Sequence, residues 1–269
     1  DADQFDRQKR IAGWNQEAIS SIRVLVVGAG ALGNEVVKGL AQIGVERITL
    51  VDFDKVVRAN LNRCVFFCPR DAANGEFKAR VISRRIRSVN KKTKVRAVIK
   101  KAEELGEEFY SNFGVAFSCL DNLGARLHVN ANCYGKVPLI DGGTTGFFGK
   151  VQVAYSPSAC LECAMSRQDY QFLWRRYSCL GDPLDFMDPK TPALSTTNSI
   201  VAALQVNEFV KLVHSNGLAA KPHKAPHVVD ESATEKTDSS WLLGNTLVGK
   251  YLFYDGIRNE QKVFSVAKR

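Results

Sequence analysis

The segment that most constrains the fold is a glycine-rich turn between an apolar strand and a helix. Residues 22–27 are mostly apolar, which is typical of a buried parallel strand, and they lead directly into Gly28, Gly30 and Gly33. Glycines at this spacing permit a tight turn and a close approach to a phosphate. The helix expected over residues 34–43 directs its positive N-terminal end toward that phosphate. The segment therefore predicts a βαβ unit that binds a nucleotide.

Two carboxylates follow the next apolar strand. Asp52 stands 24 positions after Gly28, and Asp54 comes two residues later. At this separation the second strand of a βαβ unit presents a carboxylate to ribose hydroxyls. Taken alone, the pattern favours an NAD-dependent dehydrogenase.

Length and composition limit the architecture. With 269 residues the chain can bury a large core, and we expect a single domain over residues 1–269 rather than two equal ones. It is 45% hydrophobic and 24% charged, and no apolar run reaches the roughly 18 residues of a membrane span. Because the N-terminus is acidic rather than signal-like, we expect a cytoplasmic protein without a membrane partner.

The remaining pattern predicts an α/β fold. Strands are expected at residues 94–99, 114–120, 137–141 and 150–155, helices at 71–90, 124–135 and 197–213, and a closing hairpin at 252–254 and 263–266. A glycine-rich turn is expected at 142–146, a crossover loop at 164–192 and a flexible loop at 217–240. The predicted fold class is a Rossmann-like, doubly wound, mostly parallel sheet with an antiparallel C-terminal extension.

The formal charge of +9 indicates a modest excess of basic residues. They are densest at residues 80–94, where an amphipathic helix would turn Arg84, Arg85 and Arg87 to solvent. Since no aromatic side chains are interleaved with these arginines, the pattern disfavours a nucleic-acid partner.

An ordered set of polar residues carries a resemblance to a known superfamily. The set consists of Arg7 within residues 6–10, the glycine turn, Asp52-x-Asp54, Asn60-x-x-Arg63, Lys78, and Asp121-Asn122 after the 114–120 strand. Its order resembles that of the ubiquitin-activating and ThiF/MoeB adenylyltransferase superfamily. The resemblance continues through Gly142-Gly143, Cys160-x-x-Cys163 and residues 192–198.

This resemblance implies an ATP-dependent enzyme that adenylates the C-terminal glycine of a ubiquitin-like or sulfur-carrier protein with a β-grasp fold and a Gly-Gly end. Its further partners would be a conjugating enzyme and a second copy of the chain. In the resulting homodimer Arg7 of each subunit would complete the site of the other subunit. In the implied site Asp52 holds the ribose, Asn60 and Arg63 contact the phosphates, Lys78 lies against the α- and β-phosphates, and Asp121 positions Mg²⁺. The implied nucleotide site comprises Gly28, Gly30, Gly33, Asp52, Asp54, Asn60, Arg63, Lys78 and Asp121.

The seven cysteines are an odd number in a long chain, which favours reduced thiols. Cys160 and Cys163 form half of a tetrahedral zinc site, which needs two more ligands. By resemblance the other half is a second C-x-x-C beyond the closing hairpin, where this sequence ends. Either Cys179 or a histidine (His214, His223 or His227) could substitute, so zinc is left open.

Cys179, 16 positions after Cys163, stands where relatives carry a nucleophile that forms a thioester. Arg175 and Arg176 could lower its pKa, and a buried structural cysteine is the alternative. The other four cysteines (Cys64, Cys68, Cys119, Cys133) are expected in the core.

Three further functions stay open at this point. One is a sulfur-carrier adenylyltransferase that forms no thioester, and a second is a cyclase similar to the tRNA threonylcarbamoyladenosine enzymes. The third is the NAD-dependent dehydrogenase. A non-catalytic subunit of a dimer is disfavoured because every expected ATP contact is present in the sequence.

Overall fold

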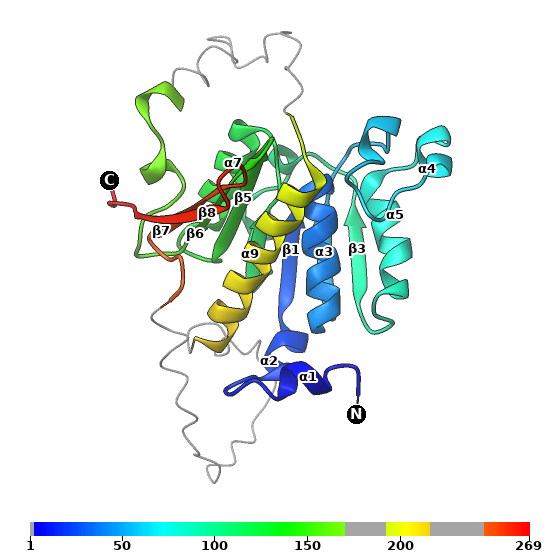
Figure 1. The fold of residues 1–269 in the computed structure, drawn as a ribbon, viewed down its shortest axis with the longest axis horizontal. Helices are drawn as coiled ribbons and strands as arrows, with labels where there is room; N and C mark the ends of the chain where they lie inside the picture. The colour runs from blue at the N-terminus through cyan, green and yellow to red at the C-terminus, as the bar shows by residue number, and fades with distance from the viewer. Residues whose placement is uncertain (1–2, 170–191, 216–244) are drawn as a thin grey trace.

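A computed structural model describes residues 3–169, 192–215 and 245–269, which form one eight-stranded mixed sheet flanked by helices (Figure 1). The strand order is β3-β2-β1-β4-β5-β6-β7-β8. The strands are β1 (Arg23–Val27), β2 (Arg47–Val51), β3 (Lys94–Val98), β4 (Val115–Ser118), β5 (Leu139–Thr145), β6 (Phe148–Ala154), β7 (Lys250–Asp255) and β8 (Glu260–Ser265). The helices are α1 (Asp6–Lys9), α2 (Gln16–Ser21), α3 (Ala31–Ile43), α4 (Pro69–Ala73), α5 (Lys78–Arg85), α6 (Glu107–Tyr110), α7 (Leu123–Cys133) and α9 (Ser195–His214).

The sheet has a parallel half and an antiparallel half. Strands β3, β2, β1, β4 and β5 pair in parallel, whereas β5 to β8 pair antiparallel. The predicted fold class, a doubly wound sheet with an antiparallel C-terminal extension, is confirmed. Because parallel strands present their carboxyl ends at one edge, the loops after β1, β2, β4 and β5 meet there.

Two apolar cores cover the two faces of the sheet. Helices α3, α5 and α9 pack on one face, and α3 and α9 lie side by side across β1 (Figure 1). Their close approach depends on Gly39, since a Cβ there would lie 3.2 Å from a methyl carbon of Val206. The smaller core on the other face includes Tyr110, Val129 and Leu139.

The structure differs from the sequence prediction at residues 71–90. Instead of one helix, α4 ends at Ala73 and α5 begins at Lys78. Gly75 lies between them at φ 59°, a left-handed conformation that L residues rarely adopt and that ends a helix. The prediction that Arg85 faces solvent holds only in part, because its side chain is 31% exposed and its guanidinium forms a bidentate ion pair with the buried Asp71.

The predicted glycine-rich turn at 142–146 is mostly strand. Residues 142–145 continue β5, because each of them pairs with a residue of β6. The chain turns only at Gly146, whose φ is 54°, and Phe147. The other predicted strands, the helices at 124–135 and 197–213, and the closing hairpin are confirmed to within a few residues.

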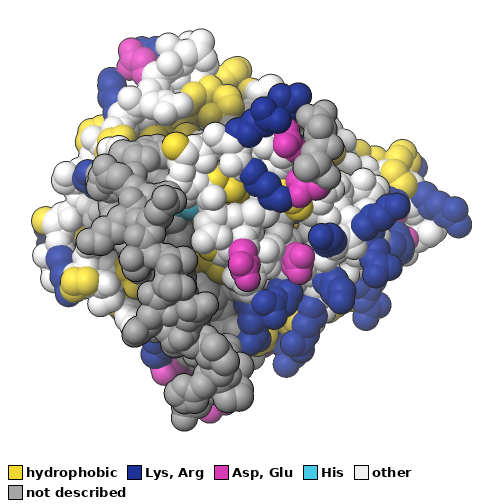
Figure 2. Space-filling view, turned by 90° about the horizontal axis from the view of Figure 1, so that it is seen from below, with side chains coloured by type: hydrophobic (Ala, Val, Ile, Leu, Met, Phe, Trp, Pro, Cys, Tyr) yellow, Lys and Arg dark blue, Asp and Glu magenta, His cyan; other side chains and the backbone are white. Residues whose placement is uncertain are grey.

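Basic side chains gather on the side of the molecule that carries α5 and β3 (Figure 2). Exposed members of this group include Arg80, Arg87, Lys94 and Arg96. On an edge strand such as β3, positive charge discourages pairing with a strand of another chain.

No helix within the described ranges is long and apolar enough to cross a lipid bilayer. The predicted crossover loop at 164–192 and flexible loop at 217–240 fall largely outside the described residues. Their assignment, like the single-domain assignment, stays a prediction.

Candidate nucleotide-binding site

A pocket of about 570 Å³ lies at the carboxyl edge of the parallel strands. Its walls come from the glycine turn, the segments after β2 and β3, the start of α5, the β4–α7 connection, and β5. Most of the predicted nucleotide-site residues line it together: Gly28, Gly30, Asp52, Asp54, Asn60, Arg63, Lys78 and Asp121. Gly33 and Arg7 do not line it.

The three glycines of the turn have different physical roles. Gly28 adopts φ 100°, and a Cβ there would lie 2.5 Å from the carbonyl oxygen of Cys119. A Cβ at Gly33 would lie 1.9 Å from the carbonyl oxygen of Gly28, so these two glycines let the turn pack against β4 and α3. A Cβ at Gly30 would meet nothing within 4 Å. Gly30 is therefore the glycine that leaves open space for a ligand.

This difference predicts opposite outcomes for two matched variants. Gly33→Ala should lower the free energy of unfolding by about 2 kcal/mol, since displacing a backbone carbonyl outweighs the roughly 1 kcal/mol that alanine adds to helix propensity. Gly30→Ala should unfold like the wild type but bind nucleotide less tightly. Chemical denaturation and calorimetric titration with ATP measure the two effects. Equal stability of both variants would contradict the packing role of Gly33.

Asp52 fixes the glycine turn and faces the pocket. Its Oδ2 accepts the backbone N–H of Ala29 at 2.6 Å, and its Oδ1 accepts that of Asp54 at 2.8 Å. Burial raises the pKa of Asp52 above its usual value, whereas the charge of Lys78 and these two N–H groups act against the rise. Each oxygen keeps a lone pair that can accept a ribose hydroxyl.

Cationic and amide side chains form the adjoining wall. The Lys78 Nζ lies 2.7 Å from Asp54 Oδ2, and the side chain of Lys78 is only 12% exposed. Asn60 is buried, and its Oδ1 accepts the N–H of Val57 at 3.0 Å. The Arg63 guanidinium donates to the carbonyl of Ala59 and so lies back along its own turn. Lys78 and Arg63 thus give this wall of the pocket positive charge, which suits phosphate groups.

Asp121 comes from the connection between β4 and α7. The neighbouring Asn122 accepts the N–H of Ala125 at 3.2 Å and thereby begins α7. The carboxylate of Asp121 is exposed at the pocket, and such an oxygen donor suits Mg²⁺, which usually binds through one or two carboxylates and substrate phosphates.

Several pocket residues were not predicted from the sequence. Lys100 and Lys101 enter because they follow β3, which is the neighbour of β2 in the sheet. Arg126 enters from the first turn of α7, where its Nε donates to Asp141 Oδ1 at 2.9 Å. Its position four residues after Asn122 was the available signal, because residues four apart share one helix face.

Arg7 lies far from the pocket of its own chain. Helices α1 and α2 sit beneath the amino ends of the parallel strands, whereas the pocket lies at their carboxyl ends (Figure 1). They are held there because Gln8 and Gln16 both donate to the carbonyl of Ile43 at the end of α3.

The C-x-x-C thiols converge, with Cys160 Sγ 3.8 Å from Cys163 Sγ. The backbone N–H of Arg269 donates to Cys163 Sγ and lowers the pKa of that thiol. Across residues 3–169, 192–215 and 245–269, no further His, Cys, Asp or Glu completes a metal-binding group, so zinc stays a prediction. Cys179, with Arg175 and Arg176, lies outside the described residues.

The remaining cysteines are mostly core residues, as predicted. Cys64, Cys119 and Cys133 are buried, and burial raises the pKa of Cys64 to about 11. Cys68 is half-buried, with its sulfur 3.2 Å from an Arg85 Nη.

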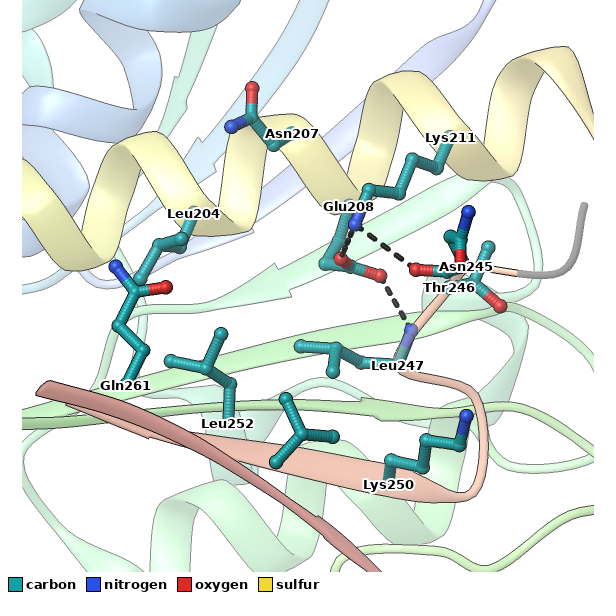
Figure 3. Close-up of a pocket in the computed structure, with 11 residues that line it drawn as sticks. Leu204, Asn207, Glu208, Lys211, Asn245, Thr246, Leu247, Lys250, Leu252 and Gln261 are labelled. Atoms are coloured by element: carbon teal, nitrogen blue, oxygen red, sulfur yellow. Dashed lines mark hydrogen bonds and ion pairs between the residues drawn. The ribbon is translucent and has the colours of Figure 1, made fainter. Parts of the chain in front are cut away.

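A second pocket, of about 300 Å³, separates α9 from β7 and β8 (Figure 3). Glu208 accepts the N–H of Leu247 at 2.7 Å and lies 2.6 Å from Lys211 Nζ, which also donates to the carbonyl of Asn245. These contacts fasten the chain to α9 where it enters β7. None of the predicted site residues lines this pocket.

The model of the ThiF family matches residues 5–268. The chain belongs to the ThiF family. The resemblance inferred from the sequence motifs is thereby confirmed.

Two ThiF-family relatives are named for ubiquitin-like modifiers. The chain is 35% identical over 151 residues to SUMO-activating enzyme subunit 2 of Dictyostelium discoideum, covering 55% of this chain and 22% of that protein. It is 34% identical over 166 residues to the NEDD8-activating enzyme E1 catalytic subunit of Caenorhabditis elegans, covering 56% of this chain and 38% of that protein. In each case the match spans less than half of the relative.

Solved structures share the ThiF-type fold. E. coli MccB with MccA superposes with a TM-score of 0.71 at 17% identity, covering 100% of this chain and 73% of that one. PaaA superposes with a TM-score of 0.65 at 19% identity, covering 93% and 74%. At these identities the likeness concerns the fold alone.

Proposed function

We propose that this chain uses ATP to adenylate the C-terminal carboxylate of a ubiquitin-like or sulfur-carrier protein that ends in Gly-Gly. The observation that carries the proposal is the convergence of Asp52, Asn60, Arg63, Lys78 and Asp121 in one pocket of a ThiF-family chain. Because the cysteine content favours reduced thiols, we place the reaction in the cytoplasm.

The pocket suits this reaction electrostatically. A carboxylate oxygen of the carrier protein attacks the α-phosphorus of ATP, the bond to the bridging oxygen breaks, and pyrophosphate leaves. Negative charge therefore accumulates on several phosphate oxygens at once. In the proposed arrangement Lys78 and Arg63 neutralise this charge. Asp121 would hold Mg²⁺, which would supply further positive charge to the phosphates.

The proposed functional unit is a homodimer. Helix α1, which carries Arg7, lies at the opposite edge of the sheet from the pocket of its own chain, and this supports a role of Arg7 in the partner's pocket. There its guanidinium would contact the triphosphate.

Transfer to a thiol is the second proposed step. The Cys179 thiolate attacks the acyl-adenylate, a thioester forms, and AMP leaves. A conjugating enzyme is then the proposed acceptor of the acyl group. The support for this step is the position of Cys179 after Cys163 together with the two relatives named as modifier-activating enzymes.

Incubation with ATP, Mg²⁺ and candidate Gly-Gly proteins tests both steps. ATP–pyrophosphate exchange should require the carrier protein, and a reductant-sensitive adduct should form that Cys179→Ala abolishes and Cys68→Ala keeps. Exchange without any carrier would contradict the proposed function. Exchange without an adduct would reject the thioester and assign the chain to sulfur-carrier activation. A requirement for tRNA, or binding of NADH, would favour the other two functions.

A further inference from the structure

One side chain of α9 forms hydrogen bonds with the last residue of β4 and with a residue near the start of β5. Gln205 is fully buried, and its Nε2 donates to the carbonyl oxygens of Ser118 at 3.2 Å and Ile140 at 3.1 Å. Ser118 is the last residue of β4, and Ile140 belongs to the neighbouring strand β5. The amide of Gln205 therefore bridges the two strands where their regular pairing ends.

The chemistry of this contact requires a donor. Both partners are backbone carbonyls, which only accept hydrogen bonds, so an apolar side chain or a carboxylate of similar size cannot replace the amide. The Gln205 Oε1 and the Ser118 Oγ are buried without a hydrogen-bond partner among the described residues. The fit is also sterically close, since a Cβ at Gly142 would lie 2.4 Å from Gln205 Cδ.

The segment after Ser118 carries Asp121. Cys119 is fixed because its N–H donates to the Val27 carbonyl at 2.8 Å, and Asn122 is fixed as the N-cap of α7. Asp121 lies on the short link between these two fixed residues, so its position depends on where β4 ends. Gln205 holds that end.

The segment after Ile140 contributes to another wall of the pocket. Asp141 follows directly and holds the pocket residue Arg126, and Gly142 and Gly143 come next. The hydrogen bonds of Gln205 reach β4 and β5, whereas the glycine turn and Asp52 form the opposite side of the pocket.

We infer that Gln205 is a positioning residue for the side of the pocket that carries Asp121 and Arg126, on which Asp121 would hold Mg²⁺. It acts through Asp121 and through Arg126 rather than by touching the substrate. This inference rests on the proposed adenylation.

The Gln205→Met variant tests the inference, because methionine keeps the volume and removes the donor. Exchange should slow by about tenfold, and the Mg²⁺ concentration for half-maximal exchange should rise by about fivefold, since small displacements of a metal-binding group are costly. Calorimetry should show unchanged affinity for adenosine, whose ribose is expected at Asp52 on the other side of the pocket. In Gly142→Ala the new methyl group would displace the amide of Gln205. This variant should therefore also show slower exchange and a higher Mg²⁺ requirement, with unchanged affinity for adenosine.

Val206→Ala is the matched control, because Val206 is the next residue on α9 and packs on Gly39 away from the pocket. It should lower the unfolding temperature and leave the Mg²⁺ dependence unchanged. A Gln205→Met protein that is merely less stable, with wild-type Mg²⁺ dependence well below its unfolding temperature, would overturn the inference. So would equal losses of adenosine and Mg²⁺–ATP affinity.

The two proposals fail in distinguishable ways. If the wild type shows no carrier-dependent exchange, the proposed function fails. The Mg²⁺ dependence of ATP binding, measured by calorimetry, still tests Gln205.

Discussion

ATP–pyrophosphate exchange by the Asp121→Asn variant is expected to be two to three orders of magnitude slower than by the wild type, about 10²–10³-fold. The substitution keeps the size of the side chain and the helix cap made by Asn122, but it removes the charge proposed to hold Mg²⁺. Exchange measured over a range of Mg²⁺ concentrations checks this result.

The control for Asp121 is Glu107→Gln, which removes a carboxylate of α6 outside the pocket. It should exchange like the wild type, and wild-type exchange by Asp121→Asn would reject the metal role. Mixing Asp121→Asn with Arg7→Ala subunits then tests the dimer. If Arg7 acts across the interface, a mixed dimer contains one intact site and recovers part of the activity. If the two kinds of subunit are shown to form mixed dimers and no activity is recovered, that role of Arg7 is rejected.

The Asp71→Asn variant is expected to lose about 3 kcal/mol of unfolding free energy, the lower end of the cost of breaking a buried ion pair, because Asp71 is buried but Arg85 is 31% exposed. Asp71 is 1% exposed, and its carboxylate pairs with Arg85 at 2.6 and 2.7 Å. It also accepts the Cys68 N–H at 2.7 Å, which begins α4. Asparagine leaves the guanidinium of Arg85 without its carboxylate. Urea denaturation measures the loss.

The same pair predicts a pH dependence of stability. Burial raises the pKa of Asp71, but the Cys68 N–H and the Arg85 guanidinium outweigh it, so the pKa lies below its usual value. The folded state therefore binds this proton less readily than the unfolded state does. The stabilisation is complete above the unfolded pKa of about 3.9 and disappears as pH falls through the folded pKa.

We therefore expect the free energy of unfolding of Asp71→Asn to lie below that of the wild type at neutral pH. At low pH the two free energies should become equal. The control is Glu76→Gln, whose partner Arg84 is 55% exposed, and it should change stability little because exposed pairs are weak. A constant difference between Asp71→Asn and the wild type down to the lowest pH would contradict the ion-pair explanation.

Local signals were sufficient to predict the core of the fold and one part of the site. The apolar run into Gly28, the carboxylates after β2 and the Asp121-Asn122 pair after β4 are each contained in a few residues. The glycine turn, the carboxylates and the Asp121-Asn122 pair each follow a parallel strand. Since the carboxyl ends of parallel strands share one edge of the sheet, their convergence could be predicted without knowledge of side-chain contacts.

Local signals failed where a residue's role depends on a distant partner. Arg85 resembles a solvent-facing arginine on an amphipathic helix, yet its environment is set by Asp71 across the Gly75 break. Gly142 and Gly143 resemble a turn, yet they are strand because β6 returns alongside them.

By itself, the sequence determined the fold class, the family and the order of the expected ATP contacts, since turn glycines and strand periodicity act over short distances. Only the tertiary structure decided that Lys100 and Arg126 line the pocket and that Gln205 bridges β4 and β5. Gln205 and Ser118 are 87 positions apart, and their contact exists only because α9 packs across the completed sheet.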